Sequence, residues 1–259
     1  MILPLVFTSF VMVVTLLYAS VLDYRDRRVP FRTWYPAIIT GIPAIGYLYL
    51  TFFLEARYPL LAFCLIFSVI FSIIFYLFAY FNLFGGADAW AFIFITLFIP
   101  LFPVTPLLGQ TPLGYFPFSV LTNAVILNLF VPVGIFLYNI SRGNRAPAHY
   151  LFFGFPVSGK TIRKSHGFVM EDIADADGTL QRRFIPARDL MVRALRGQRT
   201  TYTRDLRQDP EKYRDEIALY ERAGHVWILY GIPFIIPITA GVIMALCIGD
   251  LIFIVLSLV

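Results

Sequence analysis

Six long apolar stretches make up most of the chain, five before residue 141 and one after residue 226. Each has roughly the 20 residues that an α-helix needs to cross the hydrocarbon of a bilayer. None of them alternates apolar and polar residues with period two, as membrane β-barrel strands do. The pattern therefore predicts six transmembrane helices, over residues 2–22, 34–54, 59–83, 88–108, 118–140 and 227–259.

The composition excludes a soluble globular enzyme. Of the 259 residues, 59% are hydrophobic and only 14% are charged, whereas about 25% of an ordinary soluble domain is charged. A single water-soluble core of this composition would have too little polar surface to cover it, so the apolar excess is expected to face lipid. The predicted fold class is an all-α polytopic membrane protein with a small α+β cytoplasmic domain.

Lysine and arginine residues are distributed unequally between the two sides of the membrane. Four lie between the first two predicted helices, sixteen lie in residues 141–226, and Arg57 lies between the second and third helices. Because cytoplasmic segments are enriched in basic residues, the first two groups are predicted to be cytoplasmic and both termini to lie outside the cell. The basic cluster follows the first apolar stretch, so this stretch is expected to be retained rather than cleaved as a secretory signal.

Residues 141–226 differ from the rest of the chain, with 16 basic and 11 acidic residues. Short runs of apolar and β-branched residues, with the hairpin-turn pair Asp177-Gly178, predict a small antiparallel sheet. Two helices are expected to follow, each beginning near a proline and ending near a glycine. The strands are expected within 149–157, 161–173 and 179–185, and the helices over 186–197 and 210–223.

Carboxylates at the membrane are costly, so each one outside the cytoplasmic domain is a functional candidate. Glu55 lies beside Arg57 in a short outer loop and is most simply a surface charge. Asp250 is expected near the outer interface, as a boundary residue. Asp23 and Asp88 differ, because the topology places both at the inner face, where the first helix leaves the membrane and the fourth enters it.

Two carboxylates within a few ångströms of each other cannot both ionise cheaply, so they share a proton. One can then act as a base toward water and the other as an acid toward a carbonyl oxygen, which is the chemistry of an aspartic protease. Gly85 and Gly86 precede Asp88 and would let another segment approach its carboxylate. The alternative is that Asp23 and Asp88 only cap helices or pair with neighbouring arginines.

The residues around both aspartates resemble those of the archaeal preflagellin peptidases. Asp23 ends the first helix, Pro30 follows seven residues later through a basic stretch, and Asp88 is preceded by Gly85-Gly86-Ala87. That family is the archaeal branch of the type IV prepilin peptidases, membrane aspartic proteases with a GxGD motif. Six helices with a cytoplasmic domain before the last also fit, so the resemblance covers essentially the whole chain.

The resemblance implies a function and a site. Asp23 and Asp88 match the two catalytic aspartates, and Gly85, Gly86 and Ala87 match the glycine-rich lead-in, although the strict motif has glycine in place of Ala87. The implied partners are precursors with class III signal peptides, whose basic leaders are removed at the cytoplasmic face. No metal or other cofactor is implied. Asp26 is an alternative first acid, but the spacing to Pro30 favours Asp23.

The last apolar stretch contains Pro233 and Pro237 near its start. Prolines inside a helix remove backbone hydrogen bonds and bend it. As a hypothesis, the bend and the freed carbonyls shape a substrate groove near the two acids, as a proline motif is thought to do in the similar presenilin-type proteases. The alternative is a bend that serves only packing.

Residues 154–161 match the phosphate-loop pattern G-x-x-x-x-G-K-[ST]. A phosphate loop needs a helix directly after it, because the amides at the helix N-terminus hold the phosphate. The residues that follow here favour a strand and are interrupted by Gly167. Nucleotide binding is therefore not expected.

Other ligands are also not expected. Residues 175–178 suggest a calcium loop, but Phe184 stands where its bidentate glutamate belongs. Cys64 and Cys247 lie in apolar runs, and the three histidines are scattered, so no disulfide or metal site is predicted. The basic run over 182–207 has few aromatic residues, which favours the headgroups of anionic membrane lipids over nucleic acid as its partner.

Two other classes of function remain possible from the residues alone. A membrane transporter or receptor would use the intramembrane carboxylates to bind an ion or a substrate. A phosphate-loop module on a membrane anchor would bind ATP through Lys160.

Overall fold

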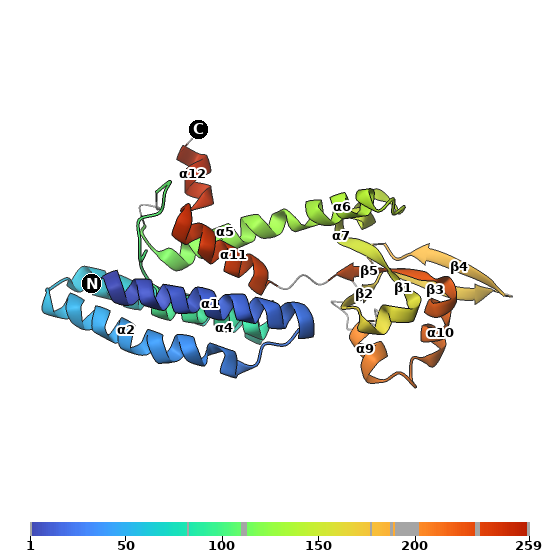
Figure 1. Cartoon of the computed structure of the whole chain (residues 1–259), viewed down its shortest axis with the longest axis horizontal. Coiled ribbons are helices and arrows are strands. Elements are labelled where there is room, and N and C mark those ends of the chain that lie inside the picture. Colours follow the sequence, from blue (N-terminus) through green and yellow to red (C-terminus); the bar gives the residue numbers. More distant parts are fainter. Residues whose placement is uncertain are drawn as a thin grey trace. The chain divides into compact units, whose positions relative to one another are not determined.

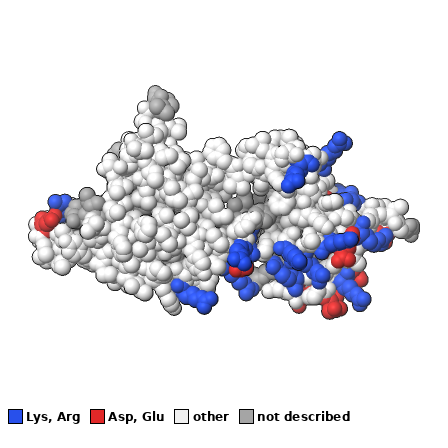
Figure 2. All heavy atoms as spheres, in the orientation of Figure 1, with Lys and Arg blue, Asp and Glu red and all other residues white. Residues whose placement is uncertain are grey.

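The computed structural model divides the chain into two compact units. The first contains residues 1–129 and 233–259, and the second contains residues 130–232. The structure describes residues 2–81, 83–109, 113–176, 178–186, 189, 202–230 and 234–257. On the face that Figure 2 shows, most Lys, Arg, Asp and Glu side chains lie on the second unit, and few lie on the first.

The first unit is helical (Figure 1). Its helices are α1 (Ile2–Asp26), α2 (Tyr35–Leu54), α3 (Tyr58–Tyr80), α4 (Gly86–Phe98), α5 (Phe116–Leu129), α11 (Ile235–Cys247) and α12 (Leu251–Ser257), and a 3₁₀ turn, η1 (Phe31–Trp34), precedes α2. Helix α1 packs against α2 and α11, α3 packs against α4, and α5 packs against α11. Buried residues of α1, α4, α5 and α11 form one core that includes Leu16, Phe92, Val120 and Val242.

Four described helical segments are long and apolar enough to cross a membrane: Leu3–Asp26, Phe31–Leu54, Tyr58–Tyr80 and Phe116–Ser141. A fifth is added if α11 and α12, which meet at a bend of 52°, form one broken span. Helix α4 has 13 residues, about 20 Å, and is shorter than the roughly 30 Å of bilayer hydrocarbon. The chain is a mostly helical membrane protein with four or five candidate spans, and the prediction of six is not confirmed.

Prolines explain why α4 is shorter than the helix predicted over 88–108. The helix ends at Phe98, and Pro100 follows Ile99. The residue before a proline is disfavoured in helical geometry, and proline itself donates no backbone hydrogen bond. The apolar pattern continues past this point, but the helix does not.

The helix predicted over 227–259 also differs from the structure. Residues 227–230 belong to strand β5 (His225–Tyr230), whose aromatic and β-branched residues suit a strand. Helix α11 begins only at Ile235, and the chain breaks again at Gly249, whose φ of 124° favours glycine. Hydropathy alone did not separate these three elements because all of them are apolar.

The second unit is a small α+β region. It contains helices α6 (Val131–Ser141), α7 (Ala148–Phe153), α9 (Thr203–Gln208) and α10 (Arg214–Ala223), the 3₁₀ helix η2 (Gly159–Lys164), and strands β1 (Gly154–Ser158), β2 (Gly167–Val169), β3 (Glu171–Ala176), β4 (Thr179–Phe184) and β5. Strands β1, β5 and β2 form an antiparallel sheet in that order, and β3 and β4 form a hairpin.

The hairpin turn lies where the sequence predicted it, since Ala176 pairs with Thr179 and Gly178 has a φ of 84°. Residues 149–153 form a helix and residues 161–164 part of a 3₁₀ helix, although strands were predicted for both. Helix α10 corresponds to the helix predicted over 210–223. Most of the helix predicted over 186–197 falls outside the described residues.

Packing accounts for both glycines of the phosphate-loop match. The stretch Gly154–Ser158 is not an open loop but strand β1, paired along its length with β5. A Cβ on Gly154 would lie 2.6 Å from the carbonyl oxygen of Ile228, and a Cβ on Gly159 would clash with the carbonyl oxygen of Tyr220. The helix that follows is a six-residue 3₁₀ turn rather than the expected strand, but the backbone that should cradle a phosphate is used in the sheet.

Gly159→Ala is therefore expected to destabilise the second unit, because the new methyl group would push η2 away from the Tyr220 backbone. The cost should be about 1–3 kcal/mol, as for other overpacked sites, measured by thermal or denaturant unfolding of the purified protein. Gly134→Ala in α6 is the matched control, since nothing lies within 4 Å of a Cβ at that position. Equal stability of the two variants would contradict the packing explanation.

Candidate active site

Asp23 lies in the last turn of α1, and the backbone conformation just after it ends the helix. The N–H of Arg27 donates to the carbonyl oxygen of Asp23 at 3.1 Å. Arg27 itself has a φ of 53°, in the left-handed region that commonly terminates helices. The chain turns away immediately after the aspartate, which leaves the Asp23 side chain partly exposed at the end of an otherwise apolar helix.

Asp88 lies in the first turn of α4. Gly85 is extended, with φ −62° and ψ 144°, and occupies the position just before the helix. The carbonyl oxygen of Gly85 accepts the N–H of Ala89 at 3.1 Å, which closes the first turn around Asp88. A carboxylate is favourable there, because the unpaired N–H groups give the helix N-terminus a partial positive charge.

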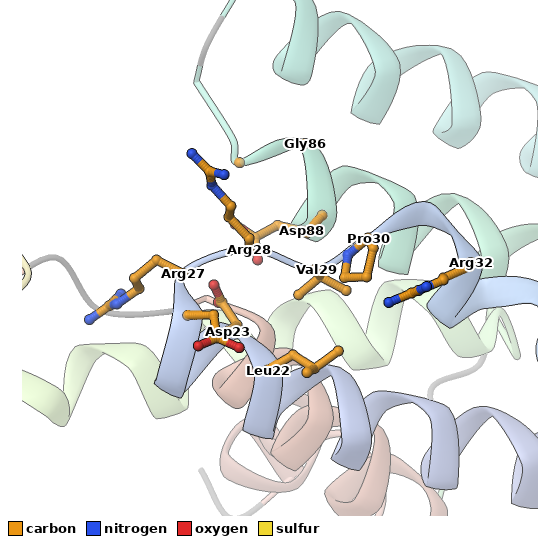
Figure 3. Close-up of a pocket in the computed structure, with 12 residues that line it drawn as sticks. Leu22, Asp23, Arg27, Arg28, Val29, Pro30, Arg32, Gly86 and Asp88 are labelled. Atoms are coloured by element: carbon orange, nitrogen blue, oxygen red, sulfur yellow. The ribbon is translucent and has the colours of Figure 1, made fainter. Parts of the chain in front are cut away.

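Asp23 and Asp88 line the same pocket, which has a volume of about 690 Å³. Figure 3 shows them on two different helices, with the segment that leaves α1 carrying Arg28, Val29 and Pro30 in the same close-up. The pocket is lined by Leu22, Asp23, Asp26, Arg27, Arg28, Val29, Pro30, Arg32, Gly85, Gly86, Ala87 and Asp88. The structure therefore brings together two acids that are distant in the sequence.

The surroundings of the two carboxylates differ. Asp88 interacts electrostatically with Asp23 and lies near the backbone N–H groups of Gly85 and Ile235. Asp23 interacts electrostatically with Arg27. Backbone N–H groups thus lie near one acid and a cation lies near the other, so the two carboxyl groups have different electrostatic surroundings.

The lead-in residues Gly85, Gly86 and Ala87 also line the pocket, but their packing differs. A Cβ on Gly85 would lie only 2.7 Å from Oδ2 of Asp88, whereas nothing lies within 4 Å of a Cβ on Gly86. Ala87 packs against the core of the first unit. Only Gly85 is thus required by close contact with the Asp88 carboxylate, and the methyl group of Ala87 is accommodated.

Pro237 is not among the residues that line this pocket, and Pro233 falls outside the described residues. Because α11 begins at Ile235, Pro237 is its third residue. A proline in the first turn removes no intrahelical hydrogen bond, so the bend expected at Pro237 does not occur there. The bend in this part of the chain lies between α11 and α12.

Sequence reasoning missed the contribution of Ile235. Its backbone N–H lies near Asp88, and the adjacent Phe234 ring packs on Phe84, with ring centroids 5.4 Å apart. These contacts bring the start of α11 to the start of α4. No sequence pattern signalled this, because an apolar residue that acts through its backbone has no distinctive side chain.

Two other carboxylates of the first unit lie outside this pocket. Glu55 forms an ion pair with Arg57 at 2.8 Å, and both side chains are about half exposed, as expected for surface charges. Asp250, which is expected near the outer interface, is only 1% exposed. It accepts hydrogen bonds from the Phe253 N–H at 3.0 Å and the Thr122 hydroxyl at 3.3 Å, and so caps α12.

The described residues contain no group of three or more His, Cys, Asp or Glu side chains that could hold a metal ion. Asp175, considered above as part of a calcium loop, accepts the Gly178 N–H at 3.0 Å and pairs with Arg222. The hydrogen bond from Arg222 lowers the pKa of Asp175 from its usual value of 3.8. This carboxylate stabilises a hairpin.

Two family models match the chain. The first is described as the type IV leader peptidase family and matches residues 10–137, which include Asp23 and Asp88. The second is described as the archaeal peptidase A24 C-terminus, type II, and matches residues 146–251. A search of curated proteins finds no match.

Proposed function

Because the chain belongs to the type IV leader peptidase family of membrane aspartic peptidases, we propose that Asp23 and Asp88 are its catalytic acids and that its substrates are preflagellin or pilin-like precursors. Cleavage of type IV prepilin-like signal peptides follows from the family itself. The proposal adds to this the assignment of Asp23 and Asp88 as the catalytic acids and of preflagellin as a substrate.

The pocket that contains both acids is the observation that carries this proposal. Between them, Asp23 and Asp88 bring two carboxyl groups to one water-accessible cavity at the ends of apolar helices. Their electrostatic interaction is the feature that lets two carboxyl groups share a proton. Family membership favours this peptidase over the transporter or receptor that the residues alone left open.

The proposed mechanism uses water as the nucleophile. The ionised acid takes a proton from water as the water oxygen bonds to the carbonyl carbon, while the protonated acid donates to the carbonyl oxygen. The resulting tetrahedral diol collapses when the C–N bond breaks and the leaving nitrogen receives a proton from the pair. The products are a carboxylate and an amine, and no covalent enzyme intermediate forms.

The position of the pocket suits the proposed substrates. Asp23 ends one candidate span, and a loop with Arg27, Arg28 and Arg32 follows it. By the positive-inside rule this edge is proposed to be cytoplasmic, which places the N-terminus outside. A precursor with a basic leader before an apolar helix would place its scissile bond at this depth. Asp26 also lines the pocket wall.

Asp23→Asn and Asp88→Asn are each expected to lower cleavage roughly a thousandfold or more, because an amide can neither take a proton from water nor donate one as a carboxyl group does. The assay is cleavage of a precursor peptide in membranes. Asp26→Asn is the matched control and should keep activity within about tenfold of the wild type. Retained cutting by Asp23→Asn together with loss in Asp26→Asn would transfer the first acid to Asp26.

Gly85→Ala is expected to lower kcat about a hundredfold while the protein remains folded, because the new methyl group would displace Oδ2 of Asp88. Gly86→Ala should stay within a few fold of the wild type, because its Cβ would point into open space. Steady-state cleavage by both variants, with helicity measured by circular dichroism, tests this. Equal losses in the two variants would show that Gly85 does not position Asp88.

A further inference from the structure

Helices α1 and α11, which pack together, are joined by a hydrogen bond between two side-chain hydroxyl groups. Oγ of Ser20 in α1 lies 2.8 Å from Oγ1 of Thr239 in α11, although the two residues are 219 positions apart in the chain. Thr239 is only 5% exposed, and Ser20 is partly buried. Hydroxyl groups that bond between apolar helices fix the position of one helix against the other. This pair therefore fixes α11 against α1 at one point.

The direction of the hydrogen bonds follows from the surroundings of Thr239. Its hydroxyl lies 2.8 Å from the carbonyl oxygen of Ile235 and 3.3 Å from that of Leu16. A hydroxyl has one hydrogen to donate and two lone pairs with which to accept. Because the Ile235 carbonyl is the closer acceptor, Thr239 donates to Ile235 and accepts from Ser20. The hydrogen bonds thus run from α1 through Thr239 to the first residue of α11.

Both ends of this series of hydrogen bonds lie close to a proposed catalytic acid. Ser20 precedes Asp23 by three residues in α1, and residues three apart are neighbours on one side of a helix. Ile235 is the residue whose backbone N–H lies near Asp88. Figure 3 shows Asp23 and Asp88 on their separate helices. The hydroxyl pair therefore connects the side of α1 that carries one acid to the backbone beside the other.

Other hydroxyl groups of the first unit bond within their own helix. Ser9 of α1 donates to the carbonyl oxygen of Leu5 at 2.7 Å, and Thr40 of α2 donates to that of Pro36 at 2.9 Å. A helix thus offers a hydroxyl a carbonyl acceptor four residues earlier. Ser20 could be satisfied in this way without a second helix. Its bond to α11 is consequently a link between helices and not only a means of satisfying a polar group.

We propose that Ser20 and Thr239 are positioning residues, whose hydrogen bond holds Asp23 opposite Asp88 while the peptide bond is cleaved. The proposal rests on the proposed function, because it concerns the two acids assigned there. Two groups that act on one substrate must keep their relative positions, and a displacement of about 1 Å can cost about a hundredfold in rate. A pair that served helix packing alone would change stability without changing the kinetics of the folded enzyme.

Removal of either hydroxyl tests the proposal by cleavage of a precursor peptide in membranes. Ser20→Ala and Thr239→Val are each expected to lower kcat about tenfold with KM within about twofold of the wild type, because substrate still binds while the acids are displaced. The double variant should lose no more than either single variant, as expected for two partners of one interaction. Thr239→Ser keeps the hydroxyl and should keep kcat within about twofold of the wild type.

Ser9→Ala in α1 and Thr40→Val in α2 are the matched controls, because their hydroxyls bond within their own helices. Both should keep kcat within about twofold of the wild type, with helicity checked by circular dichroism. Unchanged kcat in Ser20→Ala and Thr239→Val, multiplied losses in the double variant, or equal losses in the controls would overturn the proposal.

Binding of an uncleavable inhibitor tests the positioning without turnover. The probe is a peptide analogue with a tetrahedral hydroxyl in place of the scissile carbonyl, titrated into the full-length protein. Its affinity should fall about tenfold in Thr239→Val and stay within about twofold in Thr239→Ser, because both acids must reach that hydroxyl. A lower unfolding temperature of Thr239→Val with unchanged affinity would assign the pair to packing alone and overturn the proposal.

The wild type separates this proposal from the one on which it rests. A wild type that neither cleaves the precursor nor binds the analogue would overturn the proposed function and the positioning role with it. A wild type that does both, with Ser20→Ala and Thr239→Val indistinguishable from it, would overturn the positioning role and leave the peptidase intact.

Discussion

A carboxylate at the edge of a bilayer is stable only where water or polar groups reach it, and this constraint governs the arrangement of the first unit. Helix α1 is apolar for most of its length and ends within a few residues of Asp23. Helix α4 begins just before Asp88, so that its carboxylate lies in the polarised first turn. Both helix ends open onto one pocket, and the rest of the unit is a packed apolar core that keeps them there.

Asp23 and Asp88 could be selected as candidates from the sequence because charged residues are rare in this chain. Only five carboxylates lie outside residues 141–226, and each could be assessed by its predicted depth in the membrane. The long helices α1, α2 and α3 could also be predicted, because a continuous apolar run of about 20 residues bounded by polar residues is typical of a membrane-spanning helix. The hairpin between β3 and β4 followed from its turn residues, whose backbone preference is local.

The parts that the sequence did not show depend on contacts between distant segments. The strand β5 and the helix α11 are both apolar, so hydropathy does not separate them, and the strand is formed by pairing with β1 and β2. The short length of α4 depends on one proline, which a hydropathy average does not register. The Ile235 backbone lies near Asp88 where the Phe234 ring packs on Phe84, a contact between distant segments that no sequence pattern signals.

We propose that Asp23 and Asp88 act together on one substrate atom. An experimental structure with a peptide analogue that carries a tetrahedral hydroxyl in place of the scissile carbonyl tests it most directly. Both carboxylates are expected to lie within hydrogen-bond distance of that hydroxyl, about 2.6–3.2 Å. An analogue held by only one of them, with the other directed away from the pocket, would contradict it.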